Sequence, residues 1–210
     1  MLKIAVLVSG GGTNLQALIN ASKKGEIVNG EIALVISSNP DAFALERANR
    51  AGIPSKILIR KQYASMRKYD DALIELLKQF QIDLVVLAGF MTIISDRVIR
   101  TYCYRIINIH PSLIPAFSGE GFYGLHVHKA ALDRGVKVTG ATVHFVNEIC
   151  DGGPIILQES VAVMEDDTPE TLQKRVMEEV EWKLLPKAVS LFCQGKLEIH
   201  NERVIIKTNV

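Results

Sequence analysis

Cysteine is scarce in this sequence, and its spacing excludes two classes of small, cysteine-rich protein. Only three cysteines occur in 210 residues, at Cys103, Cys150 and Cys193, and no CxxC pair is present. An odd number without such pairs does not fit a disulfide framework or a zinc ribbon. We therefore expect free thiols and a reducing intracellular environment.

Long hydrophobic runs and an excess of charge of one sign are also missing. The first apolar run, Leu2 to Val8, is far shorter than the roughly 20 residues that a membrane-spanning helix needs. Glycines follow it at once, which does not fit a signal peptide. The 24 Lys and Arg residues balance 23 Asp and Glu residues, so no global field attracts nucleic acid or an anionic membrane. These absences predict a cytoplasmic protein with no nucleic-acid or membrane partner.

What the chain does have is a hydrophobic content of 48%, which is enough for a sizeable core. No repeat, low-complexity tract or linker interrupts it. We predict a single domain over residues 1–210, in which residues 1–110 form a Rossmann-like half and residues 111–210 extend it.

The first half alternates between strand-like and helix-like segments, beginning with the continuous apolar run of a strand that is buried on both faces. The expected strands are Leu2–Val8, Glu31–Ile36, Pro54–Ile59, Asp83–Ala88 and Tyr104–Ile109. The expected helices are Thr13–Lys24, Asp41–Ala51, Ala64–Phe80 and Ser95–Thr101. Repeated units of this kind predict an α/β fold, Rossmann-like, with a mostly parallel sheet and helices on both faces.

After Pro111 the pattern changes, and we expect an antiparallel or mixed C-terminal extension of the sheet. The expected elements are a loop Pro111–Gly124, a helix His128–Arg134, strands Lys137–Val146 and Pro154–Val163, a long helix Thr168–Phe192 and a hairpin Leu197–Ile206 around Asn201. A threonine followed by proline at the start of the long helix is a typical N-terminal signal.

The glycine-rich segment SGGGTN, Ser9 to Asn14, joins the first expected strand to the first expected helix. Glycines there let backbone N–H groups converge on an anion at the helix N-terminus. A nucleoside triphosphate loop is excluded because GxxxxGK[ST] is absent, and a dinucleotide fingerprint fails at Leu15. A tight turn is the alternative, but three glycines with Thr13 and Asn14 exceed what a turn needs. We favour a phosphate monoester as the ligand.

The stretch RIINIHPSLIP, Arg105 to Pro115, carries polar residues out of a buried strand. Parallel sheets bind ligands outside the carboxyl ends of their strands. Asn108 and His110 stand two residues apart, so on extended backbone their side chains share one side. A fixed amide donor beside an imidazole that can move a proton suits a carbonyl whose oxygen becomes negative. The alternative is a structural Asn and His, and the pairing at a strand exit counts against it.

The segment from Val143 to Gln158 contains an Asp-Gly-Gly-Pro turn that begins at Asp151. A carboxylate near His110 would raise the imidazole pKa and could relay a proton, although this turn alone is a structural signal. Five histidines are present, but HExxH and other ligand spacings are absent, so we expect no metal. No GxSxG elbow surrounds Ser112, so we expect no serine nucleophile.

Four segments together resemble the phosphoribosylglycinamide formyltransferases, within the family of folate-dependent formyltransferases. They are SGGGTN (Ser9–Asn14), LAGFM (Leu87–Met91), NIHPSLIP (Asn108–Pro115) and HFVNEICDGGPIILQ (His144–Gln158). Order, spacing and total length match, so the resemblance covers nearly the whole chain. It implies one formyltransferase domain, with a phosphate-binding half (1–110) and a folate-binding and catalytic extension (111–210).

The resemblance implies two small-molecule substrates and no metal. 10-Formyltetrahydrofolate is the co-substrate that gives the formyl group, and the amine of phosphoribosylglycinamide receives it in purine biosynthesis. The implied catalytic residues are Asn108, His110 and Asp151. The residues implied to bind phosphoribosylglycinamide are Gly12, Thr13 and Asn14 at the phosphate and Glu181 at the ribose. The residues implied to bind the folate are Met91, Thr92, Ile93, Ile94 and Asn108. A monomer or a homodimer is expected.

The implied chemistry is direct attack of the amine on the formyl carbon, through a tetrahedral oxyanion and without a covalent enzyme intermediate. Asn108 and a protonated His110 would stabilise the oxyanion, while Asp151 would keep His110 charged. The alternatives are a formyltetrahydrofolate deformylase, a methionyl-tRNA formyltransferase, both of which normally carry an additional domain, and a non-catalytic module that binds a phosphoribosyl ligand.

Three positions and one loop depart from the family's pattern. Thr92 and Met66 stand where the family often has arginine near the glutamate end of the folate, and Trp182 replaces a usual histidine. The loop SGEGFYG, Ser118 to Gly124, is several residues longer than typical. Because it follows the catalytic strand, we predict that it forms a flexible lid or alters the mouth of the site.

Overall fold

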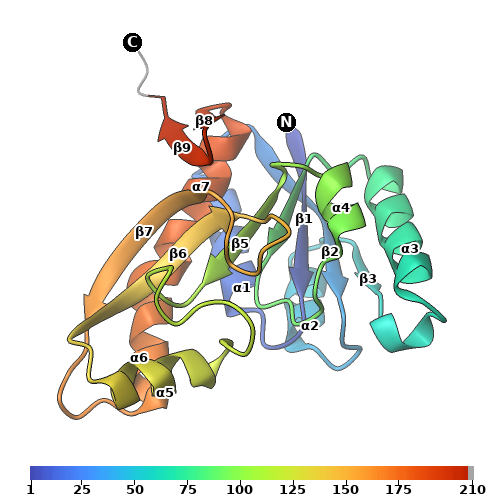
Figure 1. Ribbon diagram of the computed structural model, residues 1–210. Helices are drawn as coiled ribbons and strands as arrows, with labels where there is room; N and C mark the ends of the chain where they lie inside the picture. The colour runs from blue at the N-terminus through green and yellow to red at the C-terminus, as the bar shows by residue number, and fades with distance from the viewer. Residues whose placement is uncertain (208–210) are drawn as a thin grey trace.

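The computed structural model describes residues 1–207 and is built around one seven-stranded sheet (Figure 1). Its strand order is β3-β2-β1-β4-β5-β6-β7. β1 to β5 run parallel, β6 pairs antiparallel with β5, and β7 pairs antiparallel with β6. The strands are β1 Leu2–Val8, β2 Gly30–Ser37, β3 Ser55–Ile57, β4 Leu84–Leu87, β5 Ile106–His110, β6 Val138–Phe145 and β7 Ile155–Ala162. A separate hairpin consists of β8 Leu197–His200 and β9 Arg203–Ile206. This architecture confirms the predicted fold class.

Helices cover both faces of the sheet and enclose two hydrophobic clusters. Buried residues of α1, α2, α6 and α7 belong to one cluster, and those of α3 and α4 belong to the other. The helices are α1 Thr13–Lys23, α2 Phe43–Arg50, α3 Met66–Gln79, α4 Asp96–Thr101, α5 Leu125–Arg134, α6 Pro169–Val176 and α7 Trp182–Cys193. None of the helices within residues 1–207 combines the length and apolarity needed to cross a membrane.

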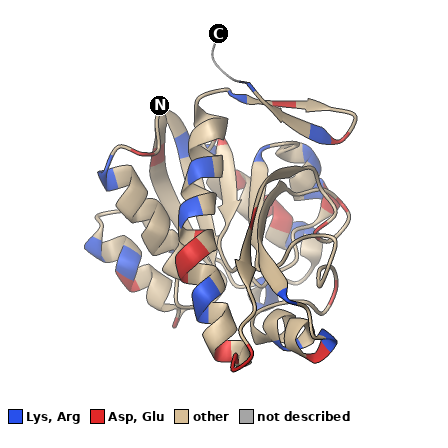
Figure 2. Cartoon of the chain, turned by 90° about the vertical axis from the view of Figure 1, so that its left-hand side faces the viewer, with Lys and Arg blue, Asp and Glu red and all other residues tan. Residues whose placement is uncertain are grey.

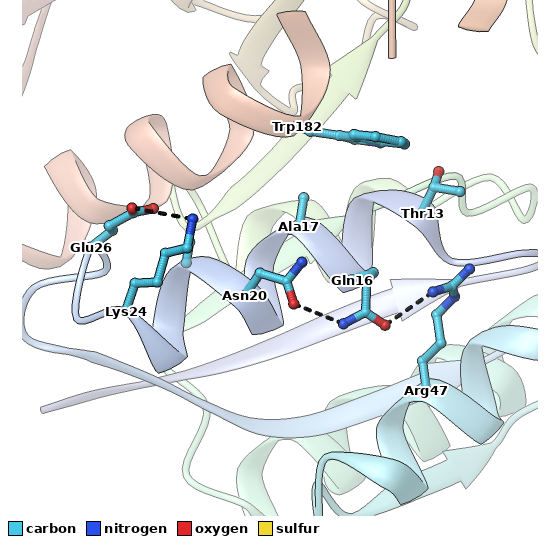
Figure 3. Close-up of a pocket in the computed structure, with 9 residues that line it drawn as sticks. Thr13, Gln16, Ala17, Asn20, Lys24, Glu26, Arg47 and Trp182 are labelled. Carbon is cyan, nitrogen blue, oxygen red and sulfur yellow. Dashed lines mark hydrogen bonds and ion pairs between the residues drawn. The ribbon is translucent and has the colours of Figure 1, made fainter. Parts of the chain in front are cut away.

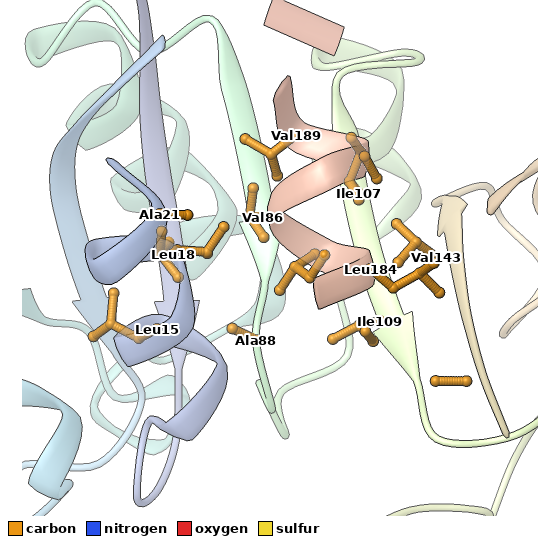
Figure 4. Packing of buried hydrophobic residues seen from close by; sticks show 14 of the residues in the cluster. Leu15, Leu18, Ala21, Val86, Ala88, Ile107, Ile109, Val143, Leu184 and Val189 are labelled. Carbon is orange, nitrogen blue, oxygen red and sulfur yellow. The ribbon is translucent and has the colours of Figure 1, made fainter. Parts of the chain in front are cut away.

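The larger cluster explains why the central strands read as unbroken apolar runs. Leu18 of α1 and Leu184 of α7 pack beside Val86 of β4 and Ile107 of β5 (Figure 4). All four are at most 3% exposed. Burying a side chain of this size stabilises the fold by about 1.5–3 kcal/mol relative to leaving it exposed. The outward face of α6 and α7 is charged instead, with both signs mixed along it (Figure 2).

The order of the strands creates a crevice at one edge of the sheet. β1 pairs with β2 on one side and with β4 on the other. The connections that follow β1 and β4 therefore leave toward opposite faces, and such a switch point is where open α/β sheets bind ligands. The glycine-rich segment follows β1, residues 91–94 follow β4, and His110 ends β5. All three predicted site segments thus reach the same edge.

Most elements end within one or two residues of the predicted bounds, and three further details differ from the sequence predictions. β5 continues to His110, because its backbone still pairs with Thr142 of β6. α5 begins at Leu125 and not at His128, since Gly124 with φ 52° turns the chain immediately before it. The long helix predicted after Thr168 is interrupted by a π-helical turn over Met177–Glu181.

The C-terminal hairpin is confirmed and projects beyond the sheet (Figures 1 and 2). Its turn residues, Asn201 and Glu202, have φ values of 49° and 59°. Two successive turn residues with positive φ are the signature of a type I′ hairpin turn.

Candidate active site

Asn108 and His110 lie on the same face of β5, as their spacing predicts. Ile107 and Ile109, which alternate with them, point into the larger hydrophobic cluster. Ile106 belongs to the cluster on the opposite face, and this fixes the side from which the two polar residues project. The period of two along a strand, together with burial of the isoleucines, therefore determines where the amide and the imidazole lie.

Asp151 comes to this pair from the loop between β6 and β7. Its Oδ1 accepts from Asn108 Nδ2 at 3.4 Å, and its Oδ2 lies 3.4 Å from His110 Nδ1. The side chains of His110 and Asp151 are only 5% and 9% exposed. Asp151 adopts φ 53°, a conformation that is rare for residues other than glycine. The structure thus brings the three residues predicted to be catalytic into one buried cluster.

Burial and charge act in opposite directions on this cluster. Burial lowers the pKa of His110 below its usual 6.5, although the Asp151 carboxylate and the Phe117 carbonyl oppose the shift. Burial alone would raise the pKa of Asp151, but His144, His110 and the Gly119 N–H together lower it below 3.8. The cluster therefore holds an ionised carboxylate beside a largely neutral imidazole at pH 7.

The resting protonation of His110, which the sequence leaves open, therefore favours the neutral form, whereas the expected protonated form concerns the tetrahedral intermediate. The physical reason is desolvation, which disfavours the imidazolium more than Asp151 favours it. The separation of 3.4 Å between Nδ1 and the carboxylate is also long for a charge-assisted hydrogen bond, which normally spans about 2.7–2.9 Å. A proton added at Nδ1 would lie directly between the two groups.

His144 is a member of the cluster to which the sequence analysis assigned no role. It pairs with Asn108 across β5 and β6, and its Nε2 lies 3.2 Å from Asn108 Nδ2 and 3.6 Å from Asp151 Oδ1. Its Nδ1 lies 2.8 Å from the Phe145 carbonyl, which can only accept a hydrogen bond. Nε2 is therefore free to accept from Asn108. The alternation of β6 places His144 on a buried strand, but only the strand register puts it beside Asn108.

The loop after β5 contacts the same pair through its backbone. His110 Nε2 donates to the Phe117 carbonyl at 2.8 Å, and the Gly119 N–H donates to Asp151 Oδ2 at 2.9 Å. Phe117 also packs against Phe122, with ring centroids 6.4 Å apart. The predicted flexibility of residues 118–124 stays a prediction. This loop therefore already holds one hydrogen-bonding position on His110 and one on Asp151.

The glycine-rich segment leaves the N-terminus of α1 open to an anion. Gly12 is the N-cap with φ 70°, no side chain caps the helix, and the first turn has no acidic residue. A Cβ built at Gly10 or Gly11 would meet nothing within 4 Å. The unpaired N–H groups and the dipole of the first turn then face free space, an arrangement that favours phosphate.

Asn14 and Glu181 are 167 residues apart in the sequence but form a buried pair. Asn14 Nδ2 donates to Glu181 Oε2 at 2.7 Å, while Asn14 Oδ1 has no partner within the described part of the chain. Glu181 ends the π-helical turn, whose other end contacts Thr13 through Met177 Sδ. Burial raises the pKa of Glu181 to about 7. The structure therefore places the residue implied to bind ribose directly beside the phosphate loop.

Replacing Glu181 with glutamine is expected to change how stability depends on pH. The folded-state pKa is about 7 against an ordinary 4.5, so the native protein keeps a proton that the unfolded chain releases. The wild type therefore loses stability as pH rises from 4.5 to about 7, by roughly 2–3 kcal/mol. E181Q does not titrate and should lack this loss.

Urea denaturation at about pH 5 and about pH 8 measures the difference, because the linked stability changes between these values. Glu178→Gln, an exposed position in the same π-helical turn, is the matched control. If the wild type and E181Q lost stability in parallel, Glu181 would not be neutral in the folded protein.

A groove runs along α1 from the glycine-rich segment to the end of the helix (Figure 3). It encloses about 270 Å³. The lining residues are Thr13, Gln16, Ala17, Asn20, Ala21, Lys24, Glu26, Arg47 and Trp182. The indole of Trp182 lies over Ala17, and Arg47 extends toward the end of α1 that carries Thr13 (Figure 3). Trp182, where the family usually has histidine, thus forms a wall of this groove.

The segment implied to bind folate follows β4 and is joined to the glycine-rich segment. Met91 N–H donates to Ser9 Oγ at 2.8 Å. Met91 and Ile93 are 57% and 76% exposed, whereas Ile94 is buried and Thr92 is half-buried. Exposed apolar side chains at a ligand-binding edge suit a flat aromatic group. Their role in folate binding stays a prediction.

Within residues 1–207, no group of three or more His, Cys, Asp or Glu side chains is arranged to hold a metal ion. His126 and His128 lie on α5, where His128 is buried and its lowered pKa of about 4 results first from burial. Neither ring nitrogen of His128 has a partner in this part of the chain.

Comparison with known proteins identifies relatives over nearly the whole chain. The family model described as formyl transferase matches residues 2–189. The phosphoribosylglycinamide formyltransferase of Escherichia coli is 42% identical over 199 residues, covering 95% of this chain and 91% of the relative. The crystal structure of glycinamide ribonucleotide transformylase 1 from Symbiobacterium toebii superposes with a TM-score of 0.92. It is 45% identical, and the match covers 98% of this chain and 94% of that one.

Some relatives are much longer than this chain. The trifunctional purine biosynthetic protein adenosine-3 of Gallus gallus is 45% identical over 198 residues, which are 94% of this chain. The chain spans only 19% of that relative's length.

Proposed function

Because the chain belongs to the formyl transferase family, we propose that it transfers the formyl group of 10-formyltetrahydrofolate to the amine of phosphoribosylglycinamide, a step of purine biosynthesis. The observation that carries the proposal is the cluster of Asn108, His110 and Asp151 at the same sheet edge as an open, glycine-rich anion site. The two lie at the ends of β5 and β1, which are separated by β4 alone. Two strand spacings amount to about 10 Å, the scale of one phosphorylated pentose with a short side arm.

Different segments at this edge of the sheet bind the two substrates. The phosphate binds at Gly12, Thr13 and Asn14, and the ribose lies against the Asn14–Glu181 pair. The folate binds along Met91, Thr92, Ile93 and Ile94, with its formyl group next to Asn108. The exposure of Met91 and Ile93 and the orphaned Asn14 Oδ1 support this placement. Thr92 and Met66 leave the folate tail without the arginines that the family often has.

The reaction begins when the amine nitrogen attacks the formyl carbon. A C–N bond forms, and the carbonyl π electrons move onto the oxygen. Asn108 and the Nε2–H of His110 donate to that oxyanion. Both donors must first exchange a partner, because His110 Nε2–H is bonded to the Phe117 carbonyl and Asn108 Nδ2 to His144 and Asp151. Donors aimed at a developing oxyanion lower the barrier because they stabilise the transition state more than the ground state.

The second half of the reaction moves one proton. The attacking amine loses a proton, and His110 Nδ1 accepts it beside the Asp151 carboxylate. The proton then passes to the folate nitrogen as the bond from that nitrogen to carbon breaks and the carbonyl re-forms. A neutral imidazole in the resting enzyme is the form that can accept the proton, and the ionised Asp151 stabilises the imidazolium that results. No covalent enzyme intermediate is required.

A single assay tests the proposal. The purified protein is mixed with 10-formyltetrahydrofolate, with and without phosphoribosylglycinamide, while folate absorbance and formate are followed. We expect the folate product only when the amine substrate is present, together with formylated product. Formate released without the amine would identify a deformylase, and no turnover in either mixture would identify a binding module.

We also propose that the whole chain acts as one cytoplasmic unit on small molecules. Continuous pairing of β5 with β6 supports a single domain, since it joins the two halves in one sheet. The free cysteines support a reducing compartment.

A further inference from the structure

α2 packs against the glycine-rich segment more closely than a side chain would permit. A Cβ built at Gly12 would lie 2.6 Å from Ala44 Cβ and 2.9 Å from Ala44 Cα. The Ala44 N–H also donates to the Gly10 carbonyl at 3.1 Å. This approach places the residue one turn later in α2, Arg47, against the segment.

Arg47 is fixed there by three restraints. Its Nε–H donates to the Gly11 carbonyl at 2.8 Å, and its Nη1 donates to Gln16 Oε1 at 3.0 Å. The guanidinium also lies over the ring of Phe43, 5.0 Å from the centroid. A planar group held in this manner loses little freedom when it binds a further acceptor.

The charge of Arg47 has no carboxylate partner within residues 1–207. The neighbouring Arg50 stacks on the same Phe43 ring but pairs with Glu46, and Lys24 at the far end of the groove pairs with Glu26. Arg47 is half-buried, and its guanidinium points toward the end of α1 that carries Thr13 (Figure 3). Only two of its five N–H donors are used by these hydrogen bonds.

From this geometry we propose that Arg47 is a positioning residue for the substrate phosphate. It holds the Gly11 carbonyl so that the backbone N–H groups of Gly12 and Thr13 stay aimed at the anion, and it supplies a positive charge that only the phosphate neutralises. The inference rests on the proposed function, since it assigns the anion of that substrate to this loop. The helix dipole and the guanidinium act in the same direction, because both favour a negative group at the N-terminus of α1.

Binding of ribose 5-phosphate, with ribose as its uncharged counterpart, tests the proposal without turnover. Calorimetry on Arg47→Gln should show a dissociation constant for ribose 5-phosphate about 10–100-fold above wild type, the scale of a hydrogen bond to a charged group. Arg50→Gln makes the same change one turn along the helix and should stay within about twofold, as expected of an exposed pair. Arg47→Lys retains the charge without the planar fork and should fall between wild type and R47Q.

Kinetics distinguish a phosphate-specific role from general damage to the loop. R47Q should raise KM for phosphoribosylglycinamide by the same factor, with kcat and KM for the folate within about twofold of wild type. Its KM for the dephosphorylated glycinamide riboside should match wild type. Equal losses for the phosphorylated and dephosphorylated substrates would overturn the proposal, as would wild-type affinity of R47Q for ribose 5-phosphate.

The binding and transfer experiments fail independently of each other. If the wild type binds ribose 5-phosphate through Arg47 but transfers no formyl group, the proposed function is wrong and the role of Arg47 stands. If it transfers the formyl group and R47Q binds normally, only the role of Arg47 is wrong. If R47Q does not fold, R47K is compared with the wild type instead. If R47K then bound ribose 5-phosphate as tightly as the wild type at every salt concentration, the planar guanidinium of Arg47 would have no specific role in binding the phosphate.

Discussion

Asp151→Asn is expected to lower kcat by roughly 10²–10⁴-fold, the range that a positioned proton-transfer group contributes. Asparagine keeps the shape of the side chain but removes the charge that stabilises an imidazolium at His110. It also introduces an N–H₂ group where Asp151 now accepts from Asn108 and from the Gly119 N–H. The new N–H₂ group would then face either Asn108 Nδ2 or the Gly119 N–H, and two donors cannot hydrogen-bond to each other. The loss should appear in kcat more than in either KM, because the carboxylate acts on the proton and not on substrate binding.

The pH dependence of this variant gives a second readout. His110 must be neutral to accept a proton, so kcat/KM falls as pH drops through its pKa. The Asp151 carboxylate raises that pKa, although burial keeps it below 6.5. Removing the carboxylate should therefore move the acid limb of the profile to lower pH in D151N. Titration of the substrate amine is common to both enzymes and cancels in the comparison.

Asp133→Asn is the matched control, because Asp133 is exposed and its one ion pair within residues 1–207 is with Lys129 on the same helix. It should leave kcat and the acid limb unchanged, as expected of a surface pair. Near-normal turnover of D151N, or an acid limb that does not move, would show that Asp151 has no part in the proton transfer.

Gly12→Ala is expected to lower the free energy of unfolding by about 2–4 kcal/mol, because two penalties combine. The residue sits at φ 70°, where a Cβ is sterically disfavoured. The added methyl group would also lie 2.6 Å from Ala44 Cβ and 2.9 Å from the Ala44 backbone, so α2 would have to move. Urea denaturation of the variant and the wild type measures the loss.

Gly11→Ala provides a control of the same chemistry at the adjacent residue. A Cβ there meets nothing within 4 Å. We expect its stability to stay within about 0.5 kcal/mol of wild type. Its affinity for ribose 5-phosphate should still fall, because the methyl group occupies the space offered to the anion. If Gly12→Ala were as stable as Gly11→Ala, the close packing of α2 on the loop would be wrong.

Local patterns in the sequence were enough to predict the order of the elements and part of the site. Continuous apolar runs identify the central strands, because strands buried on both faces need no polar side. The period of two along β5 places Asn108 and His110 on one face, and the glycines before α1 indicate an anion site. Each of these inferences depends on residues within one segment, and the structure places each segment at the carboxyl ends of the parallel strands.

Other features of the site depend on contacts that no local pattern encodes. The sequence could not show that strand register puts His144 beside Asn108, or that a π-helical turn within the predicted long helix presents Glu181 to Asn14. The loop contacts to His110 and Asp151 involve backbone atoms, which every residue type carries, so no residue identity marks them.

The sequence by itself determined which chemical groups are available and which edge of the sheet they reach, because periodicity and turn chemistry act over a few residues. Only the tertiary structure decided the pKa values and the contacts of those groups. Burial lowers the pKa of His110 and raises that of Glu181, and this burial follows from packing by segments that are remote in the chain. The placement of Arg47 likewise follows from the contact of α2 with a loop 36 residues earlier in the sequence. Electrostatic environment is a property of the assembled fold, and for that reason the sequence could name candidate catalytic residues but not their protonation.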